Sequence, residues 1–317
     1  MRPSVLILAA VAALAAPAAA TAYGWPVKPF DRQHPIRSAF GDPRYHTDAE
    51  SAISSFHFGV DVVAPDGTRV YAVAPGVAHV HPDHVKVTRG DGRAFEYWHI
   101  SPVVRNGERI RKHELLGRIR KGWGHVHLAE SFRGAYRNPL RRGALTPFYD
   151  RTVPTVDLVE MLGPDGLPVN TSHVTGFVDV VASAYDTSPI APPAPWQNAH
   201  LAPASIWTVL RGPGIQTETT LVVDFGLRLP PNLLYPLVYA PGTYQNKANR
   251  PGRYLFWALH TFDTSTLPDG SYELEVEAVD TRGNVGARTL AFHTTNGRSS
   301  AAPDPHEPGV ADPARPE

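Results

Sequence analysis

Short runs of alternating apolar and polar residues, broken by Gly and Pro, occupy the chain from Tyr23 to about Asp150. A period of two is typical of half-buried strands, and no long segment with a helical period interrupts it. Two Gly-containing segments, 89–92 and 105–108, predict hairpin connections. The pattern therefore predicts an all-β sandwich or barrel-like domain. The expected strands are Val60–Ala64, Arg69–Ala74, Gly76–Val80, Val85–Arg89, Ala94–Ser101 and Val126–Glu130.

A second series of strands begins near Val156 and predicts an immunoglobulin-like β-sandwich. Its turns, such as 268–270 and 282–284, contain Gly, Asp or Asn, which tolerate tight bends. Two irregular stretches, 187–203 and 229–253, are expected to be surface loops. The expected strands are Val156–Met161, Gly176–Tyr185, Trp207–Arg211, Thr219–Phe225, Tyr272–Asp280 and Arg288–Thr294.

The first 22 residues have the pattern of a signal peptide, with an apolar run followed by small residues that predict cleavage after Ala20 or Ala22. The apolar run is shorter than the roughly 20 residues of a membrane-spanning helix. We therefore expect a mature form without a membrane span, secreted or located in the periplasm or cell wall. The predicted divisions are a signal peptide at 1–22, a first domain at 23–150, an immunoglobulin-like β-sandwich at 155–295 and a disordered tail at 296–317.

The composition limits which metal ligands and nucleophiles the chain can have. The chain has no cysteine, which excludes disulfides, thiolate metal ligands and thiol nucleophiles. The formal net charge is zero, but residues 23–150 have 19 Lys and Arg against 13 Asp and Glu, whereas residues 151–317 have 10 against 17. The basic first half suits an anionic polymer as well as it suits an ordinary solvated surface, and export argues against nucleic acid as that polymer.

Histidine is frequent, with 15 residues in 317, so isolated His motifs arise by chance. His79 and His81 form a His-x-His motif that we interpret as polar residues alternating at the end of a strand. His113 begins a His-Glu motif that lacks the second histidine of a zinc protease. Neither motif predicts a site.

His57 and Asp61 form a stronger candidate. On a flat strand their Cα atoms would lie roughly 13 Å apart, too far for both side chains to bind one ion. Gly59, midway between them, permits the bend that would bring the two side chains together.

Two further segments supply histidines. His125 and His127 are two residues apart and therefore share one face of a strand, so that one can bind a metal while the other reaches water beside it. The segment 95–101 alternates so that Phe95, Tyr97 and His99 share a face, although His99 could equally be a half-buried structural histidine. Two histidines and a carboxylate with an open fourth position are typical of catalytic zinc.

In their order and context these residues resemble the lysostaphin-type or LytM peptidoglycan endopeptidases. The similarity covers roughly residues 35–140. The matching elements are His57-x-Gly59-x-Asp61, Ala64-Pro65-x-Gly67-Thr68, Ala74-Pro75-Gly76-Val77, Tyr97-x-His99-x-Ser101, Gly107-Glu108-x-Ile110, Leu116-Gly117 and His125-x-His127.

The resemblance implies a compact antiparallel β domain of the barrel-sandwich type, with one Zn²⁺ per chain bound by His57, Asp61 and His127. It implies that His99 and His125 are catalytic and that the substrate is a peptidoglycan stem or crosslink peptide. The segment 117–124 before His125 is shorter than is usual in the family, which changes the expected groove wall and leaves the scissile bond open. Activity is expected to be lost near pH 5 to 6, as the histidines become protonated.

The sequence leaves two alternative functions open. The chain could be a catalytically silent module that binds cell wall or activates other hydrolases, although such proteins typically lack ligand residues that this chain has. The second domain could bind cell wall or act only as a spacer, since a fold does not determine a function.

Overall fold

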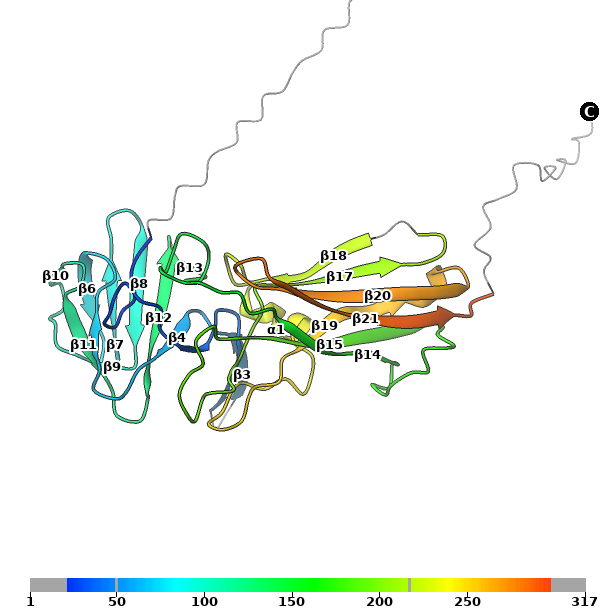
Figure 1. Ribbon diagram of the computed structural model, residues 1–317, viewed down its shortest axis with the longest axis horizontal. Helices are drawn as coiled ribbons and strands as arrows, with labels where there is room; N and C mark the ends of the chain where they lie inside the picture. Colours follow the sequence, from blue (N-terminus) through cyan, green and yellow to red (C-terminus); the bar gives the residue numbers. More distant parts are fainter. Residues whose placement is uncertain (1–21, 49–50, 216–217, 298–317) are drawn as a thin grey trace, which may run out of the picture.

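The computed structural model describes residues 22–48, 51–215 and 218–297, which form two β-rich units along the long axis of the molecule (Figure 1). The sheets are antiparallel, which confirms the predicted all-β fold class. The predicted signal peptide and tail lie outside the described residues, except for Ala22, Asn296 and Gly297. No helix in the described part of the chain is long and apolar enough to cross a membrane.

The first unit contains thirteen strands among the described residues. Their bounds are β1 Ile36–Ser38, β2 Pro43–Asp48, β3 Ser51–Phe56, β4 Val60–Val63, β5 Arg69–Tyr71, β6 Gly76–Val80, β7 His84–Thr88, β8 Arg93–Trp98, β9 Ile100–Pro102, β10 Arg109–Ile110, β11 Leu115–Ile119, β12 His125–Phe132 and β13 Ala135–Arg137.

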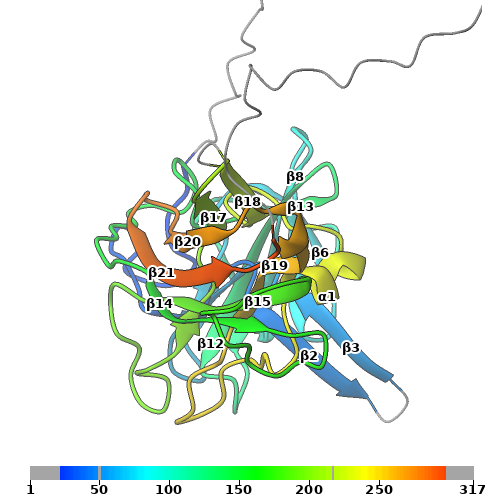
Figure 2. The same cartoon turned by 90° about the vertical axis from the view of Figure 1, so that its right-hand side faces the viewer.

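A large sheet with the order β1-β4-β12-β8-β7-β6-β10, in which β13 also pairs with β12, shares one hydrophobic core with the small sheet β5-β11-β9. Val126 and Leu128 of β12 are fully buried in this core, because β12 lies between β4 and β8. The β2–β3 hairpin projects from the molecule (Figure 2). The central position of β12 gives its polar residues a rigid support.

The second unit consists of two four-stranded antiparallel sheets that enclose a second hydrophobic core (Figure 2). This agrees with a β-sandwich, and the immunoglobulin-like topology stays a prediction. One sheet contains β14 Thr155–Leu162, β15 Phe177–Thr187, β16 His200–Leu201 and β19 Leu255–Asp263. The other contains β17 Ser205–Arg211, β18 Glu218–Asp224, β20 Gly270–Val279 and β21 Val285–Thr294. Short helices are η1 Asn232–Leu234, α1 Tyr235–Val238 and η2 Thr264–Thr266.

Several local predictions differ from the structure. The expected strand Ala94–Ser101 is interrupted at His99, between β8 and β9. The segment 105–108 is a tight turn, but it joins β9 and β10, which pair with different strands, so the predicted hairpin is wrong. The stretches 187–203 and 229–253 are not simple surface loops, because Leu201 and Tyr239 are buried in the two cores.

Buried polar contacts join the two units. The carboxylate of Asp42, which is fully buried in the first unit, accepts hydrogen bonds from the backbone N–H of Ala202 (2.6 Å) and the hydroxyl of Tyr254 (3.2 Å). Phe40 and Phe56 of the first unit lie in the core of the second. The second unit is therefore packed directly behind the strands that lead into His57.

Candidate metal centre

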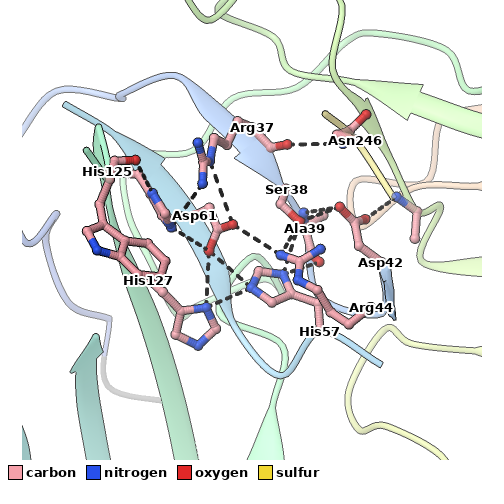
Figure 3. Close-up of polar contacts among 12 residues, drawn as sticks. Arg37, Ser38, Ala39, Asp42, Arg44, His57, Asp61, His125, His127 and Asn246 are labelled. Carbon is pink, nitrogen blue, oxygen red and sulfur yellow. Dashed lines mark hydrogen bonds and ion pairs between the residues drawn. The ribbon is translucent and has the colours of Figure 1, made fainter. Parts of the chain in front are cut away.

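Three buried side chains of the first unit converge on one another (Figure 3). Nε2 of His57 lies 3.1 Å from Oδ1 of Asp61 and 2.7 Å from Nδ1 of His127. Oδ1 of Asp61 lies 3.1 Å from the same Nδ1 of His127. The residues are only 3%, 5% and 4% exposed, respectively. The structure thus brings together the three residues that were expected to bind metal.

Strand pairing and one glycine produce this convergence. Asp61 on β4 is directly opposite His127 on β12, and His57 lies in the bend between β3 and β4. A Cβ added to Gly59 in that bend would lie 2.5 Å from the carbonyl oxygen of Leu128 and 2.7 Å from the ring of His127. The expected bend is therefore present, and the position requires glycine because the bend approaches His127 too closely for a side chain.

The donor atoms fit a metal ion. Nδ1 of His57 donates to the carbonyl oxygen of Ala39 (2.8 Å), so Nε2 of the neutral ring carries a lone pair. That lone pair faces an oxygen of Asp61, which is also an acceptor. Burial, followed by the charge of Arg44, lowers the pKa of His57 and disfavours a proton between the two atoms. A cation relieves this repulsion, and two imidazole nitrogens with one carboxylate oxygen are a ligand set of zinc.

The outer contacts of the three side chains support the same assignment. Nη2 of Arg44 donates to Oδ2 of Asp61 (3.1 Å), so that Oδ1 is left to face the two histidines. Nε2 of His127 is buried without a hydrogen-bond partner among the described residues, so the polar contacts of this ring are made through Nδ1. The ring also packs on Phe58, with the centroids 4.5 Å apart. Such second contacts orient metal ligands in known sites.

His125 is adjacent to the three residues but has a different orientation. Its Nδ1 donates to the carbonyl oxygen of Trp123 (2.7 Å), and its Nε2 points toward the site, 3.6 Å from Oδ1 of Asp61. Burial lowers the pKa of His125 to about 4 and outweighs the opposite effect of Asp61. The ring is therefore neutral near pH 7, and its acceptor nitrogen Nε2, which also has a long contact with Nη2 of Arg37 (3.4 Å), lies beside the three donor atoms.

His99 does not lie on a strand as the sequence predicted. It follows β8 with φ of +66°, in the left-handed region, and its ring stacks on Trp123 with the centroids 3.6 Å apart. The same conformation places its ring centroid 4.7 Å from that of His125. A non-glycine residue with positive φ is uncommon and is often found at functional sites. Burial, followed by the charge of His125, lowers the pKa of His99 to about 3.

A pocket of about 450 Å³ opens above these residues, and the second unit contributes to its wall. Trp196 comes from the stretch 187–203, and Gln245 and Asn246 come from the stretch 229–253. Sequence reasoning did not identify these residues or Arg37, which also lines the pocket. No local pattern marks Trp196, Gln245 or Asn246, because the two stretches that contain them read as irregular surface segments.

A separate cluster of three acidic residues does not line this pocket. Asp150, Asp186 and Asp280 have carboxylate oxygens within 4.8 Å of one another. Burial, followed by the charge of Asp150, raises the pKa of Asp186 to about 8. A protonated carboxyl at neutral pH accounts for the close approach, and the cluster lacks the histidines of the first site.

No protein-family model and no curated protein matches the chain. Among solved structures, it is similar to a zinc-containing peptidase from Vibrio cholerae, with 22% identity over 37% of this chain and 39% of that chain, and a TM-score of 0.30. The chain thus spans well under two thirds of that peptidase.

Two other structures are similar at the same level. For the deep-sea M23 metalloprotease pseudoalterin the identity is 18%, over 39% of this chain and 78% of that chain, with a TM-score of 0.28. For the SpoIIQ–SpoIIIAH pore-forming complex it is 20%, over 38% of this chain and 90% of that chain, with a TM-score of 0.31. The similar structures include M23 peptidases, the class that the sequence motifs resemble.

The thermal stability of the metal-free protein is expected to fall as the pH is lowered from about 7 to about 4. Each buried histidine has a folded-state pKa below its unfolded value of about 6.5, so the unfolded chain binds protons first. His125 and His127 each have a pKa of about 4, for which burial is the main cause. We expect the melting temperature to decrease by at least about 5 °C over this range. A constant melting temperature from pH 7 to pH 4 would contradict the buried, neutral state of these rings.

Proposed function

We propose that the protein is a zinc metalloendopeptidase that hydrolyses peptide bonds in peptidoglycan stems or crosslinks. His57, Asp61 and His127 are the proposed ligands of one zinc ion, and His99 and His125 are the proposed catalytic histidines. The observation that carries this proposal is the convergence of Nε2 of His57, Oδ1 of Asp61 and Nδ1 of His127 beside two further neutral histidines.

The side chains of this site can perform the required steps. A bound zinc ion supplies Lewis acidity to a water molecule and to the substrate carbonyl group. Nε2 of His125, an acceptor directed toward the donor atoms, can take a proton from the attacking water and return it to the leaving amine. His99 lies beside His125 and can donate a hydrogen bond to the developing oxyanion. Trp123, stacked on His99, excludes water from one side of that ring.

We also propose that the protein acts outside the cytoplasm and has two domains, at 23–150 and 155–295. The pattern of residues 1–22 supports export. The two hydrophobic cores support the two-domain division, although Leu201 belongs to the first core and Phe40 and Phe56 to the second. Because residues of each unit are buried in the core of the other, we propose that the second domain is attached rigidly to the first.

The proposed activity is tested on protein without residues 1–22, purified in the absence of chelators and supplied with equimolar zinc. We expect new amino groups to appear when this protein is incubated with purified cell-wall sacculi, and a chelator to stop their release. Because the wall chemotype is open, sacculi with glycine bridges and sacculi with direct crosslinks are both used. If zinc is bound stoichiometrically and neither preparation releases amino groups, the proposal is abandoned for a silent wall-binding or hydrolase-activating module.

A further inference from the structure

Arg37 on β1 lies in the pocket between the proposed metal ligands and the second unit. Its guanidinium group stacks on the ring of Trp196, with Cζ 4.1 Å from the ring centroid. Its carbonyl oxygen accepts a hydrogen bond from Nδ2 of Asn246 (3.3 Å), as Figure 3 shows. The preceding residue, Ile36, donates its N–H to Oγ of Ser188 (3.2 Å). The second unit therefore holds both the backbone and the side chain of Arg37.

Arg37 and the neighbouring Arg44 differ in how closely their guanidinium groups are paired with other side chains. Arg44 donates from Nη2 to Oγ of Ser38 at 2.8 Å and to Oδ2 of Asp61 at 3.1 Å, which is a close pairing. For Arg37 the contacts are longer, with Nε 3.9 Å from Oδ2 of Asp61 and Nη2 3.4 Å from Nε2 of His125. A guanidinium group has five N–H donors, so these contacts leave most of the hydrogen-bonding capacity of Arg37 for another acceptor.

The charge around the pocket favours an anion at this position. Arg37 and Arg44 both face the single carboxylate of Asp61, and a bound divalent cation adds further positive charge. Asp83, which also lines the pocket, is paired through Oδ1 with Nδ1 of His84 (3.0 Å). A guanidinium group stacked on an aromatic ring keeps its N–H edge free, and that edge matches a carboxylate in a two-point contact.

We propose that Arg37, held by Trp196 and Asn246 of the second unit, is a specificity-determining residue that binds a carboxylate of the peptide substrate beside the scissile bond. This inference rests on the proposed function. It also assigns a role to the second unit, which completes the substrate pocket instead of acting as a separable module. The carboxylate can be the C-terminal group of a stem peptide or an acidic side chain, and the two sources are separated by the choice of probe.

The test measures binding, so that it does not depend on turnover. The zinc-loaded protein carries His99→Ala to suppress hydrolysis, and three dansyl-labelled alanine tripeptides are used. The first has a free C-terminal carboxylate, the second is its carboxamide, and the third is the carboxamide with glutamate in the central position. We expect one of the two carboxylate-bearing probes to bind at least about tenfold more tightly than the uncharged carboxamide, as is usual for a hydrogen bond to a charged group.

Variants then assign this preference to Arg37. Arg37→Gln is expected to abolish the difference between the probes, and Arg37→Lys to keep only part of it, because lysine lacks the planar fork. Trp196→Ala is expected to reduce the difference as well. The matched control is Arg250→Gln, since Arg250 also stacks on an aromatic ring, that of Tyr244 (4.2 Å), but does not line the pocket. This control is expected to keep the full preference.

A preference for the first probe assigns the contact to a chain end, and a preference for the third assigns it to an acidic side chain. Equal or undetectable binding of all three probes, or a preference that survives Arg37→Gln, would overturn the inference. The proposed function fails by a different result, the absence of amino-group release by the zinc-loaded protein with His99 intact.

Discussion

The His127→Ala variant is expected to lose bound zinc and peptidase activity together. His127 supplies one of three donor atoms that lie 2.7 to 3.1 Å apart, and two remaining protein ligands do not hold zinc tightly. We expect about one zinc per chain in the wild-type protein and less than about 0.1 in the variant after gel filtration without chelators, measured by elemental analysis. Amino-group release from sacculi is expected to fall below detection.

Two further variants make this result interpretable. His79→Ala removes a histidine from the other His-x-His motif, where the exposed ring contacts Oγ1 of Thr88 (2.9 Å), and it is expected to retain zinc and activity. Asp61→Asn keeps the size of a second proposed ligand while removing its charge, and it is expected to lose zinc even if His127→Ala folds poorly. Stoichiometric zinc in both His127→Ala and Asp61→Asn would disprove the proposed ligand set.

The His99→Ala variant is expected to keep its zinc and to lose activity by a factor of roughly 10² to 10⁴, the usual contribution of a positioned acid, base or oxyanion donor. His99 is not one of the three converging side chains, and its ring faces the pocket beside His125. The measurement combines zinc content with the rate of amino-group release at saturating wall substrate.

His113→Ala provides a closely matched control for His99→Ala. His113 also has φ of +66°, and its ring also stacks on an aromatic residue, Phe30, at 3.9 Å between centroids. It does not line the pocket, so its replacement tests loss of a stacked ring at positive φ without the proposed chemistry, although His113 is exposed and His99 is half-buried. Equal losses of activity in the two variants would show that His99 acts through stability, and loss of zinc in His99→Ala would show that it supports the metal site.

The depressed pKa values also alter the pH dependence that the sequence predicted. Free histidine chemistry places the loss of activity near pH 5 to 6. In the folded protein, burial lowers the pKa of His125 to about 4 and that of His99 to about 3. The acid limit of activity is therefore expected at a lower pH than the sequence alone suggested, and the pH profile of the zinc-loaded protein measures the difference.

The alternation of apolar and polar residues was sufficient to predict the all-β class and most of the longer strands, because the period of a half-buried strand is a local property. Gly59 indicated the bend between His57 and Asp61 for the same reason, since the backbone freedom of glycine is local. The close approach of Gly59 to His127 is visible only in the structure. The strands β2, β3, β11 and β19 were missed, as were the short strands β1, β10, β13 and β16. For β19 the reason is that no turn pattern isolates it from the stretch before it.

For the candidate site, the sequence by itself identified the five residues of the proposed metal and catalytic groups, through the order of its motifs. Tertiary structure alone decided how they are arranged and what surrounds them. The positive φ of His99 directs its ring into the pocket, which strand periodicity could not predict. Arg37 is held by Trp196 and by Asn246, which is 209 positions away in the chain. Such contacts depend on how two hydrophobic cores pack together, and no pattern within a short segment encodes that packing.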